Sequence, residues 1–109
     1  MYGNGGEIRV RYQDLGELRK EVIRLLDRGE ILFDYQHMFE EGHHVADWEI
    51  ETALLDGAYD FHEDIEGRYL AKYARKREGV VVTVIFEIHE IPETRRIFVV
   101  TAFGPRRQS

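Results

Sequence analysis

Four side chains of this 109-residue chain have types and spacings that suit proton transfer beside a phosphate. His37 can donate or accept a proton because imidazole titrates near neutral pH. Arg68 and Lys72 are four residues apart, so both lie on one face of a strand, and Arg96 falls on what we expect to be the neighbouring strand. Guanidinium and ammonium groups both bind phosphate oxygens. We therefore take His37, Arg68, Lys72 and Arg96 as the candidate catalytic residues.

Each candidate also has a structural interpretation, which the sequence leaves open. His37 stands beside Tyr35 and Phe39, where a hydrogen-bonded histidine commonly packs. Arg95 and Arg96 can pair with acidic side chains of the amino-terminal half instead of a phosphate.

Other chemistries have less support in the sequence. Asp60, His62 and Asp64 alternate and would share one strand face, but this spacing is common in solvated acidic edges, so we assign no metal ligand. His43 and His44 are adjacent and cannot both face one ion on regular structure. The chain has no cysteine, and its sole serine is its last residue, so nucleophilic catalysis by either residue type is not expected.

The charge of the chain is unevenly distributed. Residues 1–66 hold 6 Lys and Arg against 17 Asp and Glu, whereas residues 67–109 hold 9 against 4, and the whole chain carries −6. The carboxy-terminal part is therefore basic. This asymmetry indicates either two layers that attract each other or a basic surface for a polyanion or an acidic partner.

The length is that of a single domain, residues 1–109. No apolar run approaches the roughly 20 residues needed to cross a bilayer. The amino terminus lacks the basic and apolar segments of a secretory signal, so we expect a cytoplasmic protein.

Three antiparallel strands are predicted at residues 67–77, 80–89 and 95–103. The second strand is β-branched and apolar until Glu87, as in a central strand buried on both faces. In the first strand, Tyr69, Ala71 and Tyr73 alternate with Arg68, Leu70 and Lys72. We expect the tyrosines to face helices, which puts the cations on the opposite face; bases could stack on the tyrosines only if their face were open.

Helical periodicity precedes these strands. Asp14 is a candidate N-cap for a helix that ends at Gly29. A second helix is predicted from Asp34 to Gly42, and a third from Asp47, its candidate cap, to Gly57. Residues 8–12 are predicted to form a short strand. Two other short segments remain ambiguous: 31–33 is extended or opens the second helix, and 58–65 is an edge strand or a loop.

These elements predict an α+β protein in which two or three N-terminal helices pack on one face of an antiparallel β-meander. The other face of the sheet is then the place to look for function.

Parts of the sequence also resemble a known group of proteins. The segment Val45-Ala-Asp-Trp-Glu-Ile-Glu-Thr-Ala-Leu-Leu-Asp-Gly57 resembles a helix of small bacterial proteins related to the BrnT and RelE toxins, including an uncharacterised branch. These relatives have a histidine upstream of the helix, matched by His37, and a Gly-Arg-Tyr strand, matched at residues 67–69. Their last strand resembles residues 99–103, followed by Pro105.

The resemblance implies helices against an antiparallel sheet and metal-independent cleavage of RNA, with no cofactor and with a co-encoded antitoxin as partner. The sequence departs from these relatives at Phe103, where they have a basic residue, and at residues 40–44, where they have an arginine-rich helix. Two alternatives follow: a catalytically inert relative that binds another protein, or a metal- or small-molecule-binding domain built around the histidines.

Overall fold

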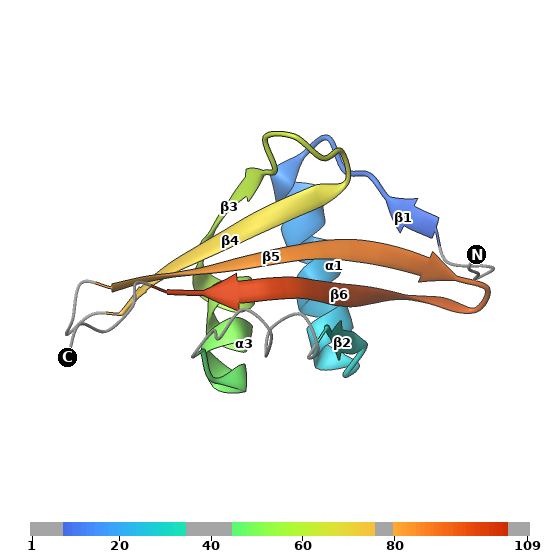
Figure 1. The fold of residues 1–109 in the computed structure, drawn as a ribbon. Helices are drawn as coiled ribbons and strands as arrows, with labels where there is room; N and C mark the ends of the chain where they lie inside the picture. Colours follow the sequence, from blue (N-terminus) through green and yellow to red (C-terminus); the bar gives the residue numbers. More distant parts are fainter. Residues whose placement is uncertain (1–7, 35–44, 76–79, 105–109) are drawn as a thin grey trace.

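The computed structural model describes residues 8–34, 45–75 and 80–104. Within these ranges, two helices cover one face of a six-stranded, mostly antiparallel sheet (Figure 1). The helices are α1 (Leu15–Asp27) and α3 (Asp47–Asp56). The strands are β1 (Ile8–Val10), β2 (Ile31–Phe33), β3 (Ala58–Phe61), β4 (Arg68–Arg75), β5 (Val80–Ile91) and β6 (Thr94–Phe103).

The sheet confirms the predicted α+β class and the meander of β4, β5 and β6. Its strand order is β2-β6-β5-β4-β3, with β1 paired to β5. β1 confirms the short strand predicted within 8–12. The helices are not strictly N-terminal, because β1 comes before α1 and β2 lies between the two helices. β2 also runs parallel to β6, so the sheet is not purely antiparallel. Strands of three residues carry too little periodicity for their pairing to be read from sequence.

β5 is the central strand, and two strands share one of its edges. β4 pairs with β5 from Val80 to Glu87, and β1 takes over from Ile88 to Glu90. β6 pairs along the other edge, with an irregularity in register between Ile85 and Phe86.

The junction of β1 and β4 is held on the helix side by a tyrosine. The hydroxyl oxygen of Tyr69 accepts a hydrogen bond of 2.6 Å from the backbone N–H of Tyr12. The same hydroxyl lies 3.4 Å from the carbonyl oxygen of Val10. Because Tyr69 is 1% exposed, this contact ties the amino-terminal segment to the interior of the sheet.

Helix α1 follows its predicted pattern. The side chain of Asp14 accepts a hydrogen bond of 2.7 Å from the N–H of Gly16, which makes it the N-cap. The buried stripe is Leu18, Val22 and Leu25, spaced by four and three residues. After the helix, Gly29 has φ +72°, the left-handed conformation that favours glycine.

Helix α3 begins where predicted but differs in its cap and in the burial of two of its apolar residues. The N-cap is Ala46, so Asp47 is the first helical residue and not the cap. The backbone N–H of Ala46 donates a hydrogen bond of 3.2 Å to Oε1 of Glu49. Ile50, Ala53 and Leu54 are buried, but the apolar residues Trp48 and Leu55 are 63% and 42% exposed. The sheet face therefore covers only part of the apolar residues of this helix.

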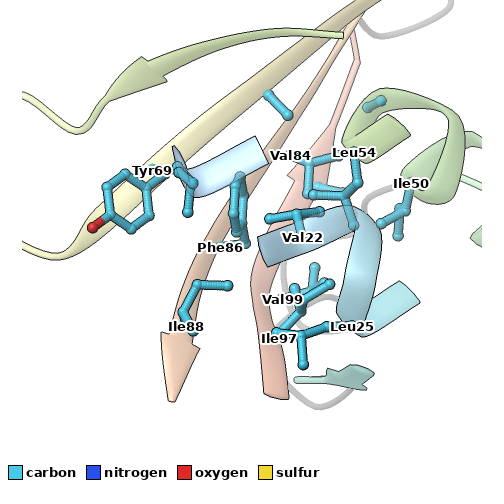
Figure 2. Packing of buried hydrophobic residues seen from close by; sticks show 14 of the residues in the cluster. Val22, Leu25, Ile50, Leu54, Tyr69, Val84, Phe86, Ile88, Ile97 and Val99 are labelled. Atoms are coloured by element: carbon cyan, nitrogen blue, oxygen red, sulfur yellow. The ribbon is translucent and has the colours of Figure 1, made fainter. Parts of the chain in front are cut away.

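The core lies between the helices and the sheet (Figure 2). The tyrosines of β4 face it, as expected: Tyr69 is buried and Tyr73 packs against the cluster. Most of the second predicted helix, 34–42, lies outside the described residues, and the segment 31–33 is the strand β2. β3 confirms an edge strand within 58–65.

Helix α3 provides a direct test of this packing. Leu54→Ala should lower the free energy of unfolding by about 2 to 5 kcal/mol, because Leu54 is fully buried. The control is Leu55→Ala, a change of the same size at a position 42% exposed, which should cost below about 1 kcal/mol. Chemical denaturation of both variants measures the difference, and equal losses would contradict the placement of α3.

Candidate functional site on the open face of the sheet

Four charged or titratable side chains, those of Arg9, Arg68, Glu87 and His89, meet on the sheet face that lies away from the helices. Strand alternation directs Arg68, Glu87 and His89 to this face, opposite to the buried Tyr69 and Phe86. In register, Arg68 pairs with Glu87, while His89 pairs with Arg9 of β1 and with Arg96 of β6. The cluster therefore forms where the edge of β5 passes from β4 to β1.

Glu87 is the centre of the cluster and is only 5% exposed. Its Oε2 accepts hydrogen bonds from Nε of Arg68 at 2.7 Å and from Nη1 of Arg9 at 3.1 Å. Its Oε1 lies 2.8 Å from Nε2 of His89. Burial raises the pKa of Glu87, but the bonds from His89 and Arg68, with the charges of Arg68 and Arg9, outweigh burial and bring it to about 2.

His89 is held on two sides. Because Glu87 is ionised, its carboxylate can only accept, so Nε2 of His89 carries the proton. The imidazole stacks on the ring of Phe98, with centroids 4.9 Å apart and planes 19° apart. These contacts fix the ring in orientation on the open face.

The three predicted cations, Arg68, Lys72 and Arg96, share this face, but they differ in whether their side chains are paired. Arg68 is engaged by Glu87. Lys72 pairs in register with Thr83 and is exposed. Among the residues that the structure describes, neither the side chain of Lys72 nor that of Arg96 has a hydrogen bond or ion pair. Arg96 lies on β6, so it is separated from β4 by β5 and is not on the neighbouring strand as expected.

The predicted histidine, His37, lies outside the described residues. The structure instead brings Glu87, His89 and Arg9 to the site, all three of which sequence reasoning missed. Glu87 and His89 had a detectable signal: they are two polar residues at a spacing of two in an apolar strand, hence on one face. Arg9 had none, because its position depends on the pairing of β1 with β5.

Arg95 behaves as its structural interpretation predicts. It faces the helices, where its guanidinium lies 3.4 Å from Oε2 of Glu21 on α1 and 3.1 Å from Oε1 of Glu90. Nη1 of Arg95 also donates to the hydroxyl of Tyr12 at 3.0 Å. Arg95 therefore belongs to the interface between the layers, whereas Arg96 belongs to the open face.

Asp60, His62 and Asp64, the three candidate metal ligands, do not lie on one strand face. β3 ends at Phe61, so His62 and Asp64 lie in the loop beyond it. Nδ1 of His62 accepts hydrogen bonds of 3.1 Å from the N–H groups of Asp64 and Ile65. No group of three or more His, Asp or Glu suited to a metal occurs in the described ranges. Nor does any helix there have the length and apolar character to cross a membrane.

The Glu87 cluster predicts a specific pH dependence of stability. The pKa of Glu87 falls from an ordinary 4.5 to about 2 on folding. The stabilisation is therefore complete above about pH 5 and is lost as the pH falls toward 2, where the folded form also takes up the proton. Glu87→Gln should cost on the order of 3 kcal/mol at neutral pH. Urea denaturation across this pH range should show the gap between wild type and variant closing on acidification.

A matched control shows whether the loss of stability requires a buried carboxylate or follows from removing any paired carboxylate. Glu66 is 78% exposed and pairs with Arg11 at 3.2 Å. Glu66→Gln should cost below about 1 kcal/mol at every pH, since exposed pairs contribute little. A gap between wild type and Glu87→Gln that stays constant from pH 7 to pH 2 would contradict the role given to Glu87.

The comparisons with known proteins add no relative to this picture. No protein-family model matches the chain, and neither a curated protein nor a solved structure matches it. The resemblance to the RelE and BrnT toxins therefore stays a prediction that rests on the quoted motifs.

Proposed function

We propose that this chain acts on RNA, with the phosphodiester backbone held across the open face of its sheet. The observation that carries the proposal is the position of Lys72 and Arg96. Both lie on that face, on either side of the Glu87 cluster, and neither has an acidic partner among the described residues. A surface cation without a partner keeps its charge available for a phosphate.

The charge of the face supports a polyanion. Arg9, Arg68, Lys72 and Arg96 bring four positive charges, against the carboxylates of Glu87 and of Asp60 at the β3 edge. Because the whole chain carries −6, this excess of positive charge is local to the open face. Such a surface attracts the backbone of a nucleic acid without reading its sequence.

Aromatic rings on the same face suit single-stranded RNA. The ring of Phe98 stacks on His89, and Phe103 at the end of β6 is 37% exposed. Unpaired bases stack on aromatic side chains, and this contact tolerates any base. The combination of cations and rings therefore favours a single strand over a duplex.

The resemblance extends the proposal to cleavage without a metal. In this reaction the 2′-oxygen attacks the adjacent phosphorus, and the bond from phosphorus to the 5′-oxygen breaks. The products are a 2′,3′-cyclic phosphate and a 5′-hydroxyl. One group removes the proton of the 2′-hydroxyl, and another protonates the leaving oxygen. His89, oriented by Glu87, and His37 are the candidate proton carriers, and Arg68 is the candidate cation beside the phosphorus.

The second candidate function is a protein-binding module without activity. The observation in its favour is that Arg68 is engaged by a buried carboxylate and that Leu32 and Val81, also on the open face, are 42% and 43% exposed. A partner protein could cover these apolar side chains. The co-encoded antitoxin implied by the resemblance is one such partner.

Binding is tested by charge removal on two surfaces. Lys72→Gln with Arg96→Gln should weaken binding of a short single-stranded RNA. It should also reduce the slope of log affinity against log salt by about 1.4, that is, about 0.7 for each lost contact. The control is Lys20→Gln with Arg28→Gln, two exposed cations of the α1 segment. Fluorescence anisotropy measures both, and equal losses in the two double variants would refute the open-face site.

Cleavage is tested on the same RNA in the presence of a chelator. His89→Ala should slow the formation of the cyclic phosphate by about 10² to 10⁴-fold if His89 transfers the proton. His37→Ala is the parallel variant, and loss in that variant alone would assign the proton transfer to His37. RNA that wild-type protein binds but leaves intact would restrict the function to binding.

A further inference from the structure

The geometry points to a subsite for one unpaired nucleobase at the end of the sheet next to Arg68. The inference rests on the proposed binding of RNA and names where a base would be recognised. The site is a pocket of about 320 Å³ between the β1–α1 connection and the β3–β4 loop, which lie together at the top of Figure 1. Its lining includes Gln13, Phe61, His62, Glu66 and Arg68.

Arg68 links the pocket to the open face. The residue lines the pocket, and its guanidinium is bonded to Glu87 in the charged cluster. A phosphate bound beside Arg68 therefore places the attached nucleoside within reach of the pocket. A volume of about 320 Å³ is at the lower end of the range for small-molecule sites, which suits a single base rather than a folded ligand.

An exposed aromatic ring gives the pocket a stacking surface. Phe61 is 44% exposed, although its ring lies 6.2 Å from the centroid of the buried Tyr69. Phe61 lies on the edge strand β3 and is one of the residues that line the cavity. Stacking of a base on such a ring is worth about a tenfold gain in affinity.

Polar groups around the ring can bind the edges of a base. Nδ1 of His62 accepts two backbone N–H groups, so the neutral ring carries its proton on Nε2, which is a donor. Gln13 makes no hydrogen bond among the described residues, so its amide offers both donors and an acceptor. The exposed Arg11–Glu66 pair adds one cation and one carboxylate at the rim. A flat heterocycle with donors and acceptors on its edge fits this set.

The test compares strands that differ by one base. A fully abasic strand with 2′-fluoro sugars, which has no 2′-hydroxyl to attack, reports binding by charge alone. The same strand with a single 2-aminopurine should bind wild-type protein about tenfold more tightly, and its fluorescence should fall on stacking. Equal affinity for the two strands overturns the subsite and leaves the proposed function standing. Failure of wild-type protein to bind either strand overturns both.

Substitutions of single aromatic residues show which ring provides the gain in affinity from the base. Phe61→Leu should remove the tenfold gain from the base while leaving affinity for the abasic strand unchanged. Trp48→Leu, at an exposed aromatic residue on α3, should keep the gain. Loss of the gain in Phe98→Leu instead of Phe61→Leu would place the base on the open face and overturn the pocket.

A second variant guards against misfolding of Phe61→Leu, whose ring contacts the core. Gln13 is exposed, and its side chain makes no hydrogen bond among the described residues. Gln13→Ala should change the ranking of the four natural bases at the single position, with the affinity for the abasic strand unaltered. An unchanged ranking in Gln13→Ala would refute recognition of the base edge at this site, whatever the outcome for Phe61→Leu.

Discussion

The carboxylate of Glu87 is the constraint around which the sheet is assembled. It is buried where β5 exchanges one neighbour for another, and it accepts hydrogen bonds from the side chains of both neighbours, Arg68 of β4 and Arg9 of β1. A buried charge without partners would cost several kcal/mol. The arginines therefore do two things at once: they neutralise Glu87 and they fix the register of two strands against a third. Electrostatics and strand pairing specify the same arrangement.

The two faces of the sheet carry different kinds of side chain. On the helix side, apolar side chains and Tyr69 close the core, and Arg95 is neutralised by Glu21 and Glu90. On the open side, charged residues remain at the surface. The acidic helical half and the basic sheet half thus attract each other only in part. The positive charge that is left over is concentrated on the open face.

The regular parts of this architecture could be predicted from sequence, and the reason is periodicity. The alternation from Arg68 to Tyr73 gave the correct faces of β4, and the spacing of Leu18, Val22 and Leu25 gave the buried stripe of α1. The candidate site was predicted only in part, because its members come from three strands whose lateral order depends on pairing. Glu87 and His89 could have been found from their spacing on β5. Arg9 could not, since nothing local to residues 8–10 says that they join β5.

The length of chain between Arg9 and Glu87 affects when β1 pairs with β5 during folding and when it detaches. The two residues are 78 positions apart in sequence, and β1 has only three residues. Closing so large a loop costs entropy that three paired residues only partly offset, so we expect β1 to dock after the meander has formed. By the same reasoning we expect β1 to detach before the meander and to be weakly protected in amide exchange. Detachment of β1 would remove Arg9 from Glu87, so the pairing of β1 with β5 and the charge balance of the open face are coupled.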